Sequence, residues 1–128
     1  MYSNKLRLLV CLTLICLLAG FTSTALAAPS LQWYTDQVYY DNLGRLIIDG
    51  YFYNSGTRII KWVNWLEMNI YVRQHSTRWW LQESATFRDL NVTLYPGESI
   101  RWKFRIHNVD YAYFDYWDVK WRVNYQYQ

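Results

Sequence analysis

Hydrophobic and polar residues alternate with a period of two along most of the chain after residue 30. The stretch SIRWKFRIHN, residues 99–108, alternates without a break between apolar residues and basic ones. The stretch RLIIDGYFYN, residues 45–54, does the same between the turn-like sequences DNLG and NSGT. Because side chains of a β-strand point alternately to opposite faces, each stretch predicts a strand with one apolar and one hydrated face.

Three further stretches show the same alternation: WVNWLEMNIYVR (62–73), RWWLQESATF (78–87) and WDVKWRVNYQY (117–127). In the second of these the pattern predicts that Trp79, Leu81, Ala85 and Phe87 point inward, with Glu83 as the exception. No apolar pattern of period 3.6 persists. Six or seven strands separated by polar turns predict an all-β, antiparallel sandwich, with a small closed barrel as the alternative.

The first residues of the chain have a different pattern. Lys5 and Arg7 precede an apolar run, Leu8 to Leu18, and Ala25-Leu26-Ala27 ends the segment. These three parts in this order predict a secretory signal peptide, residues 1–27, that is cleaved after Ala27. We therefore expect an exported protein, secreted, periplasmic or at the cell surface, with one domain at residues 28–128. An uncleaved membrane anchor is the alternative.

Removing residues 1–27 changes the composition of the chain. Both cysteines, Cys11 and Cys16, lie in that segment, so the remainder has no disulfide and no thiolate ligand. It carries eleven Lys and Arg against ten Asp and Glu, a net charge of +1, which does not favour nucleic-acid binding. It keeps all eight Trp and twelve of the thirteen Tyr. Each buried aromatic removes about 150–250 Å² from water, so we expect an aromatic core to replace cross-links.

Three stretches resemble a known family. The sequence YYDNLGRLIIDGYFYNSG (39–56) is similar to the opening of the S-layer-associated (SLAP) domains of Gram-positive bacteria and of the related small Ig-like FxLYD domains. In those domains a Tyr-Asp-x-x-Gly turn leads into a strand ending in Gly-x-x-x-Asn. LEMNIY (66–71) resembles their central strand, and LYPGESIRWKFRI (94–106) resembles their Pro-Gly ending. The chain after Asn108 is longer and more aromatic than in the family.

The resemblance implies an Ig-like β-sandwich of about seven strands in an exported or envelope protein. It carries over no catalytic residue, because its motifs are structural. Gly50 is expected to let a neighbouring side chain approach closely. Pro96 and Gly97 are expected to form a type II turn, with Gly97 at positive φ.

We expect no catalytic residue, no cofactor and no metal. His75 and His107 are interpreted as solvated, and no Gly-x-Ser-x-Gly motif is present. The residues Asp41, Asn42 and Gly44 are interpreted as an Asx-type turn rather than a calcium loop.

A carbohydrate-active site remains the enzymatic alternative. Three carboxylates, Asp110, Asp115 and Asp118, lie close together in sequence among aromatic residues. Glycosidases need two such acids about 5–10 Å apart, and nothing in the sequence fixes their separation.

The segment NVDYAYFDYW, residues 108–117, is a candidate binding surface because Tyr-rich loops at the end of a sandwich are typical of recognition. We assign Tyr111, Tyr113, Phe114 and Tyr116 to it. The structural interpretation stays open: Tyr111 and Tyr113 extend the preceding strand, and Phe114 folds back over the core. In the pair Trp79-Trp80, one ring is expected to face solvent.

The basic row Arg101, Lys103 and Arg105 is the second candidate surface. If its strand neighbours the last strand, the row meets Lys120 and Arg122, and a basic face results, offset in part by Glu67. The partners expected are a cell-wall polymer, a glycan or another envelope protein, without nucleic acid and without a stable membrane span after cleavage. The sequence thus predicts a non-enzymatic structural or adhesive module at the bacterial surface, with a small carbohydrate-binding or carbohydrate-active protein as the alternative.

Overall fold

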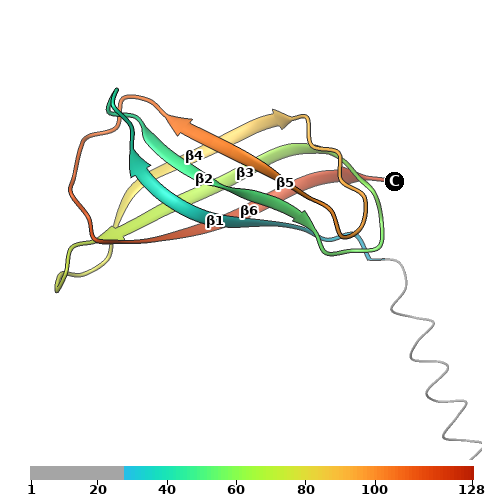
Figure 1. The fold of residues 1–128 in the computed structure, drawn as a ribbon, viewed down its shortest axis with the longest axis horizontal. Coiled ribbons are helices and arrows are strands. Elements are labelled where there is room, and N and C mark those ends of the chain that lie inside the picture. The colour runs from blue at the N-terminus through green and yellow to red at the C-terminus, as the bar shows by residue number, and fades with distance from the viewer. Residues whose placement is uncertain (1–27) are drawn as a thin grey trace, which may run out of the picture.

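The computed structural model describes residues 28–128, and the predicted signal peptide lies outside the described residues. Six strands follow one another in this part of the chain, with no helix between them (Figure 1). Their bounds are β1 (Leu31–Tyr40), β2 (Leu46–Asn54), β3 (Ile60–Arg73), β4 (Trp80–Leu90), β5 (Ser99–Ile106) and β6 (Tyr116–Tyr127). The predicted all-β class is confirmed.

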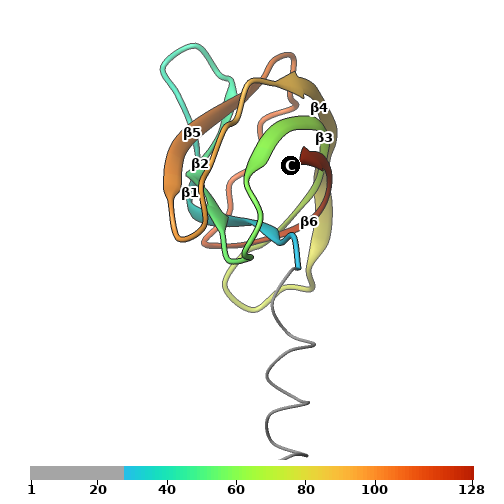
Figure 2. The same cartoon turned by 90° about the vertical axis from the view of Figure 1, so that its right-hand side faces the viewer.

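The strands form two antiparallel sheets of three, in the orders β1-β2-β5 and β4-β3-β6. Figure 2 shows β1, β2 and β5 on one side of the molecule and β3, β4 and β6 on the other. The chain crosses between the sheets after β2, after β4 and after β5. One apolar core fills the space between the two sheets, a sandwich-like arrangement.

The core comes from alternate positions of the strands. Four residues of β3, at every second position, have no exposed surface: Leu66, Met68, Ile70 and Val72. Aromatic rings link the two sheets, because Phe87 of β4 lies 4.2 Å from Phe104 of β5 between ring centroids. Each such ring contributes up to about 4–6 kcal/mol of burial before entropy is subtracted, which is consistent with a core that needs no disulfide.

Gly50 allows β1 to pack closely on β2. It pairs with Thr35, and the register of β1 shifts between Thr35 and Gln37. A Cβ atom at Gly50 would lie 2.0 Å from the Tyr34 carbonyl oxygen and 2.9 Å from the Trp33 ring. The expected close approach of a side chain at Gly50 is therefore confirmed, and that side chain is Trp33.

The predicted inward set of β4 is partly wrong. Ala85 and Phe87 do face β3 partners on the core side, but Trp80 packs against the core while Trp79 and Leu81 are 45% and 51% exposed. The cause is a register shift opposite Ile70 and Tyr71 of β3, where one extra residue enters β4. An extra residue reverses which side chains point inward beyond it.

The turns behave as their sequences predict. Gly97 has a φ of 82°, and the Glu98 amide donates to the Tyr95 carbonyl at 3.0 Å, as in a type II turn. Asp41 Oδ1 accepts hydrogen bonds from the amides of Leu43 and Arg45 at 3.0 and 2.9 Å, which forms the Asx-type turn.

Asn54 is the buried polar residue of the core. Its side-chain amide donates to the carbonyls of Arg58 and Leu94 at 2.8 and 3.0 Å, and its oxygen accepts from the Gly56 amide at 3.0 Å. Because these bonds satisfy a group that has no exposed surface, Asn54 joins the end of β2 to two neighbouring loops.

Candidate functional site

The candidate site lies at the end of the molecule where β1 ends and β6 begins. Three connections meet there: the turn between β1 and β2, the loop 74–79 between β3 and β4, and the segment 107–115 between β5 and β6 (Figure 1). The last of these contains most of the aromatic segment 108–117 identified from the sequence, whose final two residues begin β6.

Hydrogen bonds hold segment 107–115 against its neighbours. The Asp115 amide donates to the Arg73 carbonyl at 3.0 Å. Gln74 Nε2 donates to the Tyr113 carbonyl at 3.0 Å, and Gln82 Nε2 donates to the Asp110 carbonyl at 2.7 Å. These bonds hold the segment at Asp110, Tyr113 and Asp115, although it contains no strand.

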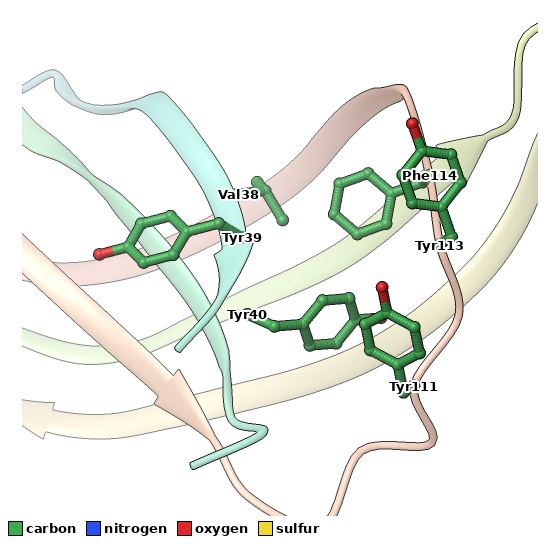
Figure 3. Close-up of a pocket in the computed structure, with 6 residues that line it drawn as sticks. All are labelled: Val38, Tyr39, Tyr40, Tyr111, Tyr113 and Phe114. Atoms are coloured by element: carbon green, nitrogen blue, oxygen red, sulfur yellow. The ribbon is translucent and has the colours of Figure 1, made fainter. Parts of the chain in front are cut away.

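Tyr40 connects this segment to β1. Its hydroxyl donates to the Ala112 carbonyl at 3.2 Å and accepts from the Ala112 amide at 3.3 Å. Its ring lies 4.8 Å from the ring of Tyr111 and 5.8 Å from that of Phe114. Between β1 and the segment lies a hollow of about 210 Å³, which we call the tyrosine pocket (Figure 3). Its lining consists of Val38, Tyr39, Tyr40, Tyr111, Tyr113 and Phe114.

The structural interpretation of the aromatic segment is right for Phe114 and wrong for the two tyrosines before it. Phe114 packs against the core, as the structural interpretation predicts. Tyr111 and Tyr113 do not extend β5, which ends at Ile106, and they are 71% and 58% exposed. An exposed pair of tyrosines therefore stands beside the pocket, on a segment whose backbone is fixed.

Asp115 fixes the position of Tyr113. Its carboxylate accepts from the Tyr113 hydroxyl at 2.6 Å and from the His75 amide at 2.9 Å. The hydrogen bond from Tyr113, followed by that from His75, lowers the pKa of Asp115, so the carboxyl group stays ionised and is a poor proton donor. Because its pKa is lowered in the folded protein, ionised Asp115 stabilises the fold. This stabilisation is fully present above the ordinary pKa of 3.8 and is lost as the pH falls through the lowered value.

The five predicted cations do not form one basic face. The strand that carries Arg101, Lys103 and Arg105 is β5, which pairs with β2 and not with β6. Lys120 and Arg122 lie on β6 in the other sheet. The predicted juxtaposition is wrong, because alternation along a strand does not determine which strand becomes its neighbour.

Carboxylates also neutralise one arginine on β5 and one on β6. Arg101 pairs with Asp36 at 2.8 Å and Asp49 at 3.3 Å. Arg122 pairs with Glu67 at 2.9 Å, as the expected offset by Glu67 implies. Lys103 and Arg105 form no ion pair within residues 28–128. Because Arg101 is paired, the basic row carries less uncompensated positive charge than its sequence indicates.

A second hollow, of about 430 Å³, lies beside β3, β4 and β6. Its lining consists of Tyr71, Trp79, Trp117, Asp118 and Lys120. Tyr71 pairs with both Leu81 of β4 and Asp118 of β6, which brings the two outer strands to the same place. We call this hollow the Trp79 platform. The sequence indicated that one ring of Trp79-Trp80 faces solvent. Tyr71 was missed because the alternation does not show that its strand, β3, lies between β4 and β6.

Segment 111–118 borders both hollows. Tyr111, Tyr113 and Phe114 line the tyrosine pocket, while Trp117 and Asp118 line the Trp79 platform. Tyr116 has an exposed ring, 43% of its surface, and stacks on Arg73 at 4.7 Å.

Within residues 28–128, no three His, Cys, Asp or Glu side chains gather closely enough to hold a metal ion. The same residues include no helix that is long and apolar enough to cross a membrane. Comparisons with family models, with curated proteins and with solved structures found no match.

Proposed function

We propose that this protein is an exported, non-enzymatic β-sandwich module of Ig-like type that binds a glycan of the bacterial cell surface through the tyrosine pocket. The export signal supports the location, since positive, apolar and small-residue parts follow in the order of a signal peptide over residues 1–27.

The resemblance to SLAP and FxLYD domains supports the fold type and the setting. Its motif residues have structural roles in this chain: Gly50 admits Trp33, Asn54 joins two loops, and Gly97 completes a turn. The single β-bridge between Ile60 and Leu94 lies where the family pattern leads us to propose a short seventh strand beside the six that are present.

One observation carries the proposal of binding: Tyr111 and Tyr113 are largely exposed and yet are held in place. Asp115 holds the hydroxyl of Tyr113, and the ring of Tyr40 packs on that of Tyr111. Exposed rings that are already ordered lose little entropy on binding. A tyrosine face attracts the partly positive C–H groups of a sugar ring, and its hydroxyl exchanges hydrogen bonds with sugar hydroxyls.

The test is retention of the full chain on purified, protein-free bacterial cell-wall glycan. The variant Tyr111→Ala/Tyr113→Ala removes both exposed rings and should weaken retention by about tenfold or more, because two aromatic contacts contribute about 1–3 kcal/mol together. The matched control is Tyr95→Ala. Tyr95 is 56% exposed and precedes the Pro96-Gly97 turn, at the other end of the strands.

Equal retention of the double variant and of Tyr95→Ala would contradict the tyrosine pocket as the site. Retention by untreated walls but not by protein-free glycan would replace the glycan with an envelope protein as the partner. Circular dichroism of both variants and of the unmodified protein checks that the folds are the same.

A further inference from the structure

The cationic side chains of residues 28–128 differ in the groups that they contact. Arg45, Arg101 and Arg122 each form an ion pair with a carboxylate. Arg73 and Lys120, beside the Trp79 platform, lie against aromatic rings instead. A ring attracts a cation through its quadrupole but carries no net charge, so it leaves the positive charge uncompensated.

Arg73 is held between two rings. Its guanidinium carbon lies 5.1 Å from the centre of the Trp79 ring and 4.7 Å from that of Tyr116. Its Nε is buried and has no hydrogen-bond partner among the described residues. The stacking also fixes the Trp79 ring, which remains 45% exposed beside the hollow.

Lys120 provides the second charge. Its ammonium lies 5.2 Å from the centre of the Tyr71 ring, and both residues line the hollow. One carboxylate, Asp118, is also in the lining, where it can accept hydrogen bonds from hydroxyl groups. Two cations against one acid give the platform a local positive charge, although residues 28–128 are close to neutral as a whole.

We propose that the Trp79 platform is a second binding site and that it takes an acidic sugar, one that carries a carboxylate. The sugar ring stacks on the exposed face of Trp79, its carboxylate lies near Arg73 and Lys120, and Asp118 accepts a hydroxyl proton. A nucleic acid fits less well, because residues 28–128 are close to neutral as a whole and carboxylates pair with Arg101 and Arg122, which does not favour a long polyanion.

This inference rests on the proposed glycan binding and adds a separate site with its own ligand chemistry. The test measures binding of the full chain to oligogalacturonate, with a neutral maltooligosaccharide of the same length as reference. Trp79→Ala should weaken binding of the acidic sugar by about tenfold. Lys120→Gln should weaken it severalfold and make binding less sensitive to salt.

Two controls separate this site from the other surfaces. Lys61→Gln removes the same charge near the start of β3, at the other end of the strand from Tyr71 and Arg73, and should leave binding unchanged. Tyr111→Ala/Tyr113→Ala removes the tyrosine pocket and should leave part of the oligogalacturonate binding intact. Leu81→Ala removes an exposed apolar residue next to the platform and should also leave binding unchanged. Weaker binding of this variant would indicate nonspecific apolar contact.

The outcomes distinguish the two proposals. If Trp79→Ala and Lys120→Gln bind oligogalacturonate as the unmodified protein does, the platform is overturned, whether or not cell-wall glycan is still retained through the tyrosine pocket. Equal affinity for the neutral and acidic oligosaccharides would overturn the role of the two cations. Loss of oligogalacturonate binding with Trp79→Ala alone, while the double tyrosine variant keeps it, would support the platform and leave the tyrosine pocket to its own test.

Discussion

Single residues at the loop end hold together segments that are distant in sequence. Asp115 accepts from a tyrosine two residues away and from the amide of His75, forty residues away. The aspartate therefore aligns an exposed ring and joins two loops. Its charge also acts on the tyrosine, since the hydrogen bond from Tyr113 to Asp115 raises the pKa of the Tyr113 hydroxyl.

Replacing Asp115 with Asn should lower the pKa of Tyr113 toward its ordinary value of 10.0, because the amide carries no charge. A group whose pKa is raised on folding contributes stability below its unfolded pKa and loses it as the pH rises through the folded one. In the variant, segment 107–115 should therefore lose this stabilisation at a less alkaline pH than in the unmodified protein. Ultraviolet difference titration of tyrosinate measures the shift, and Tyr113→Phe identifies its signal. Identical titration of Asp115→Asn and the unmodified protein would contradict the assignment.

At the scale of elements, alternation predicts a strand well only where nothing interrupts it. The predicted inward faces of β2 and β6, and that of β3 from Leu66 onward, keep a period of two. That of β5 does so from Trp102 onward, since Ile100 is 37% exposed. Register shifts occur in β1, in β4 and in the first part of β3. No strand was predicted over residues 31–40, so Trp33 was not identified as a core residue. The inward set of β4 was reversed before Ser84, because one extra residue changes the face of all residues that lie beyond it.

Gly50 tests the packing of β1 on β2 directly. The Gly50→Ala variant should lose about 3 kcal/mol of unfolding free energy, since the new methyl group meets a backbone oxygen that cannot rotate away. Urea unfolding measures the loss, and near-ultraviolet circular dichroism reports the displaced Trp33 ring. An unchanged unfolding midpoint would mean that β1 separates from β2 at this point without cost.

At the scale of the whole molecule, the candidate sites depend on strand order, which the alternation does not contain. Tyr111, Tyr113, Phe114 and Tyr116 were identified because they follow one another in the sequence. Their partners Tyr40 and Arg73 come from β1 and β3, more than thirty residues away, and only the fold brings them together. The same limit explains why the cations of β5 and β6 were wrongly grouped on one face.

The single core between the two sheets also determines how the molecule unfolds. Every strand contributes side chains to it, and residues 28–128 contain no cysteine that could hold part of the chain together. Neither three-stranded sheet can keep its apolar face buried without the other, so the two should unfold together. We expect tryptophan fluorescence and far-ultraviolet circular dichroism to give the same midpoint in urea, with or without a reducing agent. Two separate transitions would show that one sheet persists alone. The Trp79 platform, which lies on β4-β3-β6, would then be stable independently of β1, which lines the tyrosine pocket.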